Sequence, residues 1–398
     1  MNTLTSSNIN TKNSELSTVK PIILLERCFG IFRFRVEGGL CVPVNRITRI
    51  IGFFIYLINA IFCSIFAIDV FVDFNIARIA EIAPSLMIFF QYTVTIIMQL
   101  FVEHEEFVNL FNLLKNIDYS LRVNMDDDFY KKSQVETMKL LGLLSVSYVT
   151  LMVFDLLNEV EIKIEYLLYV FVYVEIELEV LFFYILSGML RKHVVIINRY
   201  LSKFTTHRLY SKNIQLNRSN TVYVIEDCVN FIGRASSNNM RIRDLAETYH
   251  QIGKLCQIIN RTFNLLLLTT FISSFAFIII TFWTSLYYFQ SNKTIRYLLK
   301  IVVWISSQII PLIVLAINCD KLVQAKEKTK FLVNQLVIDY DLPKGMRMQA
   351  KVFMEILNVW PLRIFVYDMF CTDIHSIFKL ISLCASYLIV VIQINHFL

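Results

Sequence analysis

Residues 262–292 read TFNLLLLTTFISSFAFIIITFWTSLYYFQSN, and these 31 residues contain no charged side chain. As an α-helix the stretch is about 46 Å long at 1.5 Å per residue, and the apolar layer of a bilayer is about 30 Å thick. Such a stretch predicts a helix that crosses a membrane. We therefore expect an integral membrane protein, and the remaining apolar stretches decide how often the chain crosses.

Six further apolar stretches complete the predicted membrane region. Four of them are free of charge, the third span continues past Asp155, and the fourth span contains three glutamates. Each reaches roughly the 20 residues that a spanning helix needs. The fold class is thus predicted to be all-α, with seven transmembrane helices. The six stretches are 50–68, 82–102, 140–157, 166–190, 301–319 and 380–398.

The composition excludes several other classes. The 398 residues are 56% hydrophobic and 18% charged, and the mean hydropathy is +0.57. The 33 Phe and 19 Tyr exclude a disordered chain, and only 9 Gly argue against an enzyme with glycine-rich phosphate loops. Unbroken apolar runs argue against a membrane β-barrel. The cysteines form no CxxC and the histidines no HExxH, so we predict no metal, no cofactor, no enzyme activity and no nucleic-acid partner.

The positions of Lys and Arg orient the predicted helices. The first segment and the connections after the second, fourth and sixth helices together hold 31 basic residues, counted up to Lys351. The connections on the opposite side hold 5. Basic residues accumulate on the cytoplasmic side of membrane proteins. The N-terminus is therefore predicted to be cytoplasmic and the C-terminus extracellular. This orientation argues against a G-protein-coupled receptor, and so do the expected outer loops 69–81, 158–165 and 293–297, which contain no Cys.

The predicted organisation has six parts. Three apolar stripes at helical spacing lie in the cytoplasmic connections, at 244–262, 319–337 and 350–364. We expect them to bury against one another as cytoplasmic helical extensions, or alternatively to lie on the lipid headgroups. Residues 205–222 are polar and read as a mobile loop. The parts are a cytoplasmic segment 1–49, helices one to four 50–190 with the cytoplasmic loop 103–139, a cytoplasmic connection 191–261, helices five and six 262–319, anchor helices 320–368, and helix seven 369–398.

The last predicted helix contains the sequence SYLIVVIQI at 386–394. It resembles the TYhhhhhQF signature, with h hydrophobic, that closes insect gustatory receptors. Tyr387 and Gln393 match, whereas Ser386 replaces Thr and Ile394 replaces Phe. Residues 360–365 and 373–374 fall where that family has a short helix and turn before its pore helix. Chain length and topology agree with this family of seven-helix chemoreceptors over the whole sequence.

The resemblance implies a tastant-gated, non-selective cation channel in the plasma membrane of gustatory receptor neurons. Its implied partners are a small-molecule tastant, permeating cations, membrane lipid, and further copies or related receptors in a homotetramer or heteromer. The implied contacts between subunits run through the cytoplasmic helices and the last helix, and the apolar stripe at 244–262 predicts that Ile252 and Ile259 take part. Two other functions remain open, namely a seven-helix chemoreceptor that signals through a G protein and an odorant receptor of the same superfamily.

The pore residues follow from the family and from helical spacing. Ser386, Val390 and Gln393 share one face of the last helix. Around a fourfold axis, Gln393 would supply a ring of amides that replaces part of an ion's hydration shell, and Val390 an apolar ring that closes the pore. The alternative is that Gln393 bonds a neighbouring backbone and that Val390 is an ordinary packing residue.

The ligand is expected among aromatic and polar residues in the outer halves of helices two to five. Aromatic walls with a few polar atoms suit small organic molecules, although the same residues also fit helix packing or a membrane-interface belt. Glu175, Glu177 and Glu179 lie in the fourth span with no evident basic partner in the neighbouring spans. They predict either a hydrated pocket or a wet outer end of that helix. The candidate ligand-binding residues are Gln91, Tyr92, Tyr148, Phe154, Tyr173, Glu177, Trp283 and Tyr287.

Overall fold

A computed structural model describes residues 15–37, 40–72, 76–101, 104–123, 127–158, 164–215, 241–289 and 295–397. Its helices are α1 (Glu15–Cys28), α2 (Arg46–Val72), α3 (Ile76–Phe101), α4 (His104–Leu121), α5 (Asp127–Asn158), α6 (Ile164–Gln215), α8 (Ile242–Phe289), α9 (Ile295–Ile338), α10 (Lys344–Val359) and α11 (Ile374–Phe397). Two antiparallel hairpins join β1 (Arg35–Glu37) to β2 (Leu40–Val42) and β3 (Phe365–Val366) to β4 (Phe370–Cys371).

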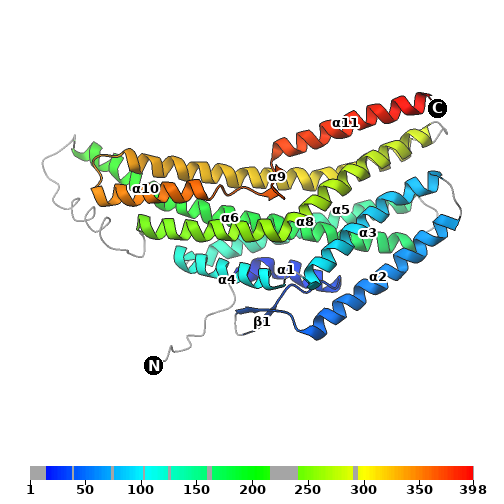
Figure 1. Cartoon of the computed structure of the whole chain (residues 1–398), viewed down its shortest axis with the longest axis horizontal. Helices are drawn as coiled ribbons and strands as arrows, with labels where there is room; N and C mark the ends of the chain where they lie inside the picture. Colours follow the sequence, from blue (N-terminus) through cyan, green and yellow to red (C-terminus); the bar gives the residue numbers. More distant parts are fainter. Residues whose placement is uncertain are drawn as a thin grey trace.

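The protein is an elongated helical bundle (Figure 1). Helices α6, α8 and α9 contain 52, 48 and 44 residues, so each is about 65–80 Å long and exceeds the thickness of a bilayer. Figure 1 shows α10 beside one end of these long helices, whereas α11 extends toward the other end. This arrangement divides the bundle into an expected membrane part and an expected cytoplasmic part.

Each of the seven predicted spans is helical over its described residues. The spans correspond to α2, α3, α5, α6, α8, α9 and α11, which confirms an all-helical, multi-pass architecture. Among the residues described, three helix segments are long and apolar enough to cross a membrane. They are Phe129–Val153 of α5, Ile242–Trp283 of α8 and Val302–Ile338 of α9. The pair Leu86–Leu100 and Glu105–Leu121, bent by 72° between α3 and α4, is a fourth candidate if the two helices count as one span.

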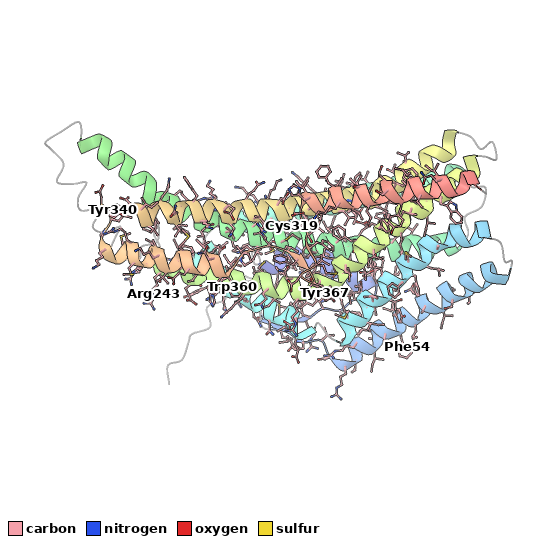
Figure 2. All side chains as sticks on the ribbon, turned by 45° about the horizontal axis from the view of Figure 1, so that its top comes forward. Phe54, Arg243, Cys319, Tyr340, Trp360 and Tyr367 are labelled. Atoms are coloured by element: carbon pink, nitrogen blue, oxygen red, sulfur yellow. The ribbon has the colours of Figure 1, made fainter. Side chains whose placement is uncertain are left out.

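The cytoplasmic stripes pack against one another, as the sequence predicted. Tyr249 of α8 contacts Phe353 of α10 with ring centroids 5.7 Å apart, and the Trp360 indole donates a hydrogen bond of 2.8 Å to Nδ1 of His250. Gly253 permits this contact, because a Cβ there would lie 2.4 Å from atoms of the Trp360 ring. In Figure 2, Cys319 lies near the middle of α9 and Tyr340 near its end, so half of α9 belongs to this extension.

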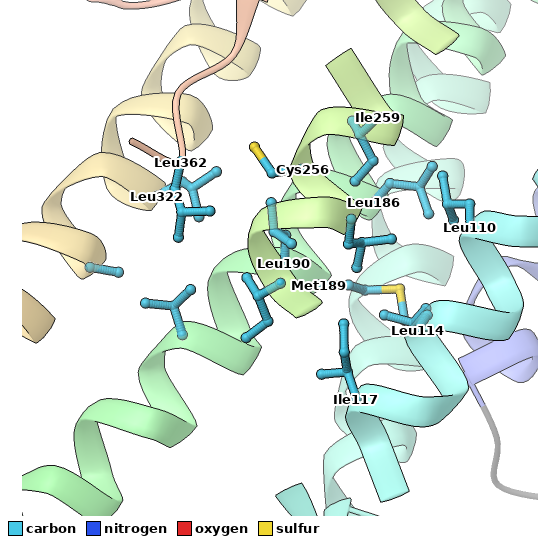
Figure 3. Close-up of a cluster of buried hydrophobic side chains, with 14 of the residues drawn as sticks. Leu110, Leu114, Ile117, Leu186, Met189, Leu190, Cys256, Ile259, Leu322 and Leu362 are labelled. Atoms are coloured by element: carbon cyan, nitrogen blue, oxygen red, sulfur yellow. The ribbon is translucent and has the colours of Figure 1, made fainter. Parts of the chain in front are cut away.

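One part of the assembly prediction is wrong. Ile252 and Ile259 are buried inside a single chain, with at most 1% of their surface exposed. Figure 3 shows Ile259 among side chains of α4 and α6, including Leu110 and Leu186. The apolar stripe on α8 is buried within its own subunit, so these two residues are not available for contacts between subunits.

The segment after α10 also differs from the prediction. The stripe at 350–364 was expected to be helical throughout, and a short helix was expected at 360–365. Helix α10 instead ends at Val359, since the residue before Pro361 disfavours the α conformation. The β3–β4 hairpin follows, and Tyr367 and Asp368 at its turn have φ values of 47° and 56°.

One further boundary is corrected, and two proposed divisions fall inside continuous helices. Helix α6 continues to Gln215, so residues 205–215 are helical rather than a loop, and 216–222 lie outside the described residues. The proposed divisions at 261/262 and 319/320 fall inside α8 and α9. The expected membrane and cytoplasmic parts are therefore linked by continuous helices.

Candidate functional site

A cluster of aromatic side chains joins five helices in the expected outer half. We call it the outer cluster and define it as Tyr92 (α3), Tyr148 (α5), Tyr173 (α6), Phe277 (α8) and Trp304 (α9), all buried. The ring centroids of Tyr148 and Tyr173 are 5.5 Å apart, those of Tyr173 and Trp304 5.8 Å, and those of Phe277 and Trp304 6.3 Å. These separations allow favourable edge-to-face and tilted contacts.

Polar atoms border the outer cluster on one side. The Tyr173 hydroxyl lies 3.1 Å from the Ser307 hydroxyl, and the Gln308 amide donates to the same phenol oxygen. The Ser274 hydroxyl donates to the Gln308 carbonyl over 3.4 Å. This chain of hydrogen bonds links α6, α9 and α8. An apolar wall with a few fixed polar atoms can orient a small organic molecule.

Two predicted ligand residues on α3 have partners within the protein. The Gln91 amide donates a 2.8 Å hydrogen bond to Thr270, and its carbonyl accepts a 2.7 Å bond from Ser273. Gln91 therefore ties α3 to α8. The Tyr92 hydroxyl donates to the backbone carbonyl of Phe29 over 3.3 Å. Tyr92 thus connects the outer cluster to the N-terminal segment.

The remaining predicted ligand residues do not all join the cluster. Trp283 is 38% exposed, and the side chains of Phe154 and Tyr287 lie outside the described residues. Glu177 is buried on α6. Two cavities among the described residues hold only about 10 and 20 Å³, whereas ligand pockets measure roughly 300–1,000 Å³. Neither cavity is lined by a residue of the outer cluster.

A charged cluster lies toward the expected cytoplasmic side of Tyr173 on α6. We call it the Arg33 cluster and define it as Glu26, Arg33, Glu175 and Glu179. Arg33 donates bonds of 2.7 and 3.0 Å to the two carboxylate oxygens of Glu26, and its Nη2 lies 2.5 Å from Glu179. Its guanidinium is held between two rings, 4.6 Å from Phe107 and 4.2 Å from Phe182. The N-terminal segment is thereby fixed to α4 and α6.

The Arg33 cluster contains three carboxylates and one guanidinium, and none of them is more than 2% exposed. Burial raises the pKa of Glu26 to about 7, Glu179 adds to this increase, and Arg33 opposes it. Neither carboxylate oxygen of Glu175 has a hydrogen-bond partner among the described residues. An excess of negative charge in a low-dielectric interior favours proton uptake, so the cluster is suited to bind a proton.

The sequence did not identify Arg33 as the partner of the glutamates on α6. In the sequence, Arg33 is one of several basic residues of the predicted cytoplasmic N-terminal segment, and the neighbouring spans offer no evident basic partner. The structure buries that segment, because the apolar residues Val19 and Ile22 of α1 have no exposed surface and belong to the main core. Three unpaired glutamates in one span were the signal that a basic side chain had to come from elsewhere.

The proposed pore residues lie on α11. Val390 is 48% exposed and Gln393 is also exposed, whereas the Ile394 side chain lies outside the described residues. The Ser386 hydroxyl donates to the carbonyl of Ser382, and the Tyr387 ring lies 5.6 Å from Phe275 of α8 in an edge contact. Val390 and Gln393 are therefore free to face another subunit or a pore, while Tyr387 contacts the chain's own bundle.

Helix α11 exposes an apolar surface on most of its circumference. It packs against the rest of the chain through Ile377 and Cys384, which are buried. Six of its large apolar side chains are 43–65% exposed. An apolar helix with so much exposed surface needs lipid or another protein chain around it. The exposed residues are Phe378, Ile381, Leu383, Ile389, Val390 and Ile392.

Comparison with protein families decides the classification. Residues 19–395 match the family model described as "7tm Chemosensory receptor". The chain belongs to this family. It is therefore a multi-pass membrane protein of a receptor family and not an enzyme. A search of curated proteins found no match.

Solved structures give the same architecture. The insect olfactory receptor OR5 from Machilis hrabei is similar, with a TM-score of 0.65 at 12% identity over 95% of this chain and 98% of that chain. The same receptor in complex with eugenol gives a TM-score of 0.63, also at 12% identity and with the same coverage. At this level of identity the similarity shows the seven-helix chemoreceptor fold alone.

Proposed function

We propose that this chemosensory receptor is a gustatory receptor, a tastant-gated and non-selective cation channel that assembles as a tetramer. The observation that carries the proposal is α11, with Val390 and Gln393 exposed on one face of an apolar helix that its own chain covers on one side only. Four copies around an axis bury that surface and form one polar and one apolar ring. The taste assignment rests on Tyr387 and Gln393 at the spacing of the gustatory signature.

The subunits are proposed to meet at surfaces that their own chain leaves open. Apolar side chains on the cytoplasmic ends of α9 and α10 remain exposed, among them Phe331, Val352 and Val359. They replace Ile252 and Ile259 as candidate contacts. The assembly is a homotetramer or a heteromer with related receptors, embedded in the plasma membrane of gustatory neurons.

The ligand is proposed to be a small organic tastant, such as an aversive plant compound, that enters the outer cluster. Support comes from buried aromatic rings next to the polar chain that begins at Tyr173. The olfactory receptor OR5 from Machilis hrabei, which has a similar fold, was solved in complex with eugenol. An odorant is therefore the alternative ligand class.

The test is whole-cell recording from cultured cells that express the chain, with a panel of sugars, alkaloids and volatile aromatics. A ligand-gated channel gives currents that persist when a non-hydrolysable GDP analogue fills the pipette. Currents that require G-protein turnover would favour a receptor that signals through a G protein, as would an N-terminal epitope stained without permeabilisation. Responses restricted to volatile compounds would favour an odorant receptor.

Tyr173→Phe tests the ligand site. It removes the hydroxyl that lies against Ser307 and Gln308 and leaves the buried amide of Gln308 with an unmatched donor. The Tyr173 hydroxyl is proposed to orient the ligand, and the loss of one hydrogen bond costs about 0.5–1.5 kcal/mol, so the half-maximal ligand concentration should rise about two- to tenfold. Trp283→Phe is the control, because Trp283 is exposed away from the cluster. Equal dose–response curves for both variants and the parent would contradict this location of the site.

A further inference from the structure

A polar groove lies where the expected cytoplasmic ends of three membrane helices meet. Ser133, Thr137 and Leu140 of α5, Arg191 and Lys192 of α6, and Asn318 of α9 line it. Its enclosed volume of about 10 Å³ holds no more than one water. The groove is shallow and partly open, so a larger group can be bound at its mouth but not within it.

Span boundaries place this groove at the level of the lipid headgroups. Leu140 is the first residue of the third predicted span, Arg191 directly follows the fourth, and Asn318 lies at the end of the sixth. The span boundaries follow only from the positions of charged residues in the sequence. The structure brings the three residues at these boundaries together in one groove. Since basic residues mark the cytoplasmic side, the groove faces the headgroups of the inner leaflet.

The groove offers hydrogen-bond donors that the protein itself does not use. Arg191 Nε is buried and has no hydrogen-bond partner among the described residues. Lys192 Nζ donates bonds of 2.9 Å to Ser133 and 2.5 Å to Glu136, and one of its three hydrogens remains available. Arginine and lysine together with a hydroxyl are the donors that bind phosphate oxygens in proteins.

The electric charge around the groove also favours an anion. Arg191 and Lys192 face one carboxylate, that of Glu136, whose side chain is 45% exposed and can turn into water when an anion takes its place. Three further lysines of α5 lie on the exposed surface nearby along the chain. These are Lys131, Lys132 and Lys139.

On the membrane side of the groove, α5 is apolar and open to lipid. Leu143, Val146 and Val149 are 60–69% exposed and follow Leu140 toward the expected outer side. A bound molecule with a phosphate at the groove and acyl chains along this surface satisfies both halves of the site. A free phosphate would use only the polar half.

We propose that this groove binds the headgroup phosphate of an anionic phospholipid from the inner leaflet. Arg191 and Lys192 hold the phosphate, and the acyl chains lie along the exposed face of α5. The lipid would then join α5 to α6 and α9 at the level where the membrane part passes into the cytoplasmic extension.

The experiment measures lipid binding to the full-length receptor in detergent by native mass spectrometry. Dioctanoyl phosphatidylserine and dioctanoyl phosphatidylcholine are titrated separately, and inorganic phosphate is added as a competitor. We expect phosphatidylserine to bind at least tenfold more tightly than phosphatidylcholine, and Arg191→Gln to remove this preference. Lys254→Gln is the matched control, because it deletes one exposed positive charge of α8 that does not line the groove, and it should keep the preference.

Three outcomes would overturn the proposal. The first is equal binding of both lipids to the parent protein. The second is an unchanged preference in Arg191→Gln that is correctly folded by size-exclusion chromatography. The third is displacement of phosphatidylserine by inorganic phosphate at equal concentration, which would show a site for free anions. If Arg191→Gln does not fold, Lys192→Gln with retained folding gives the same decision.

Discussion

Arg33→Met removes the only positive charge of the Arg33 cluster while keeping an unbranched side chain between Phe107 and Phe182. The change leaves Glu26 and Glu179 without the bonds of 2.5–3.0 Å that they now accept from the guanidinium. Breaking a buried ion pair by removing one partner costs about 3–5 kcal/mol. A deficit of 3 kcal/mol lowers the ratio of folded to unfolded protein roughly 150-fold.

The deficit should depend on pH in a defined direction. Burial already raises the pKa of Glu26 from 4.5 to about 7, and the loss of Arg33 removes the influence that opposes this increase. A carboxyl group whose pKa is raised in the folded state binds protons more tightly when folded, so stability falls as the pH rises above 4.5 toward and beyond 7. Arg33→Met should therefore differ from the parent more at pH 8 than at pH 6.

The assay is heat inactivation followed by fluorescence-detected size-exclusion chromatography, which reports the fraction of receptor that remains folded. Arg33→Lys retains the charge but cannot form the bidentate contact with Glu26, so it should lie between the parent and Arg33→Met. The triple variant with Glu26→Gln and Glu179→Gln removes the stranded charges and should recover part of the loss. If Arg33→Met is as stable as the parent at both pH values, the buried ion pair does not stabilise the N-terminal segment.

Three variants of the pore and of the cytoplasmic packing give further predictions. Val390→Ala should raise current without ligand because it widens and hydrates the apolar ring, and recording at matched surface levels checks it. Gln393→Ala should change the relative permeability to sodium, potassium and calcium, and unchanged reversal potentials would contradict this. Gly253→Ala should lower the free energy of unfolding by about 1–3 kcal/mol, because its Cβ would meet Trp360. Gly142→Ala, whose Cβ would have no atom within 4 Å, should leave the free energy of unfolding unchanged. Thermal inactivation of both variants checks this.

The membrane helices could be predicted from the sequence because their cause is local. A run without charges cannot remain in water, and within lipid the backbone must form its hydrogen bonds internally, so each such run becomes a helix. The stripes of α8 and α10 were equally readable, since spacing alone places Tyr249 and Phe353 on apolar faces. The apolar and polar faces of these helices could therefore largely be predicted from the sequence.

Partners between distant segments could not be predicted in the same way. Arg33 and Glu179 are far apart in the chain, and no local pattern distinguishes a buried arginine from one of the many basic residues on the cytoplasmic side. The outer cluster was identified in part, because Tyr92, Tyr148 and Tyr173 were named from their positions in the spans. Phe277 and Trp304 were missed, since apolar aromatic residues in a membrane helix carry no signal of their own.

The exposed surface of α11 argues for assembly on energetic grounds. Gln393 presents an amide on a helix that is otherwise apolar, and burying an amide in hydrocarbon without a hydrogen bond costs roughly 2–7 kcal/mol. The single chain leaves this amide exposed, whereas it buries the amides of Gln91, Gln99 and Gln308. Around a symmetry axis, the same amide meets water, ions or its own copies and the penalty disappears. A position that is unfavourable in the monomer and favourable in a ring is thus the physical reason to place Gln393 at the axis of the proposed pore.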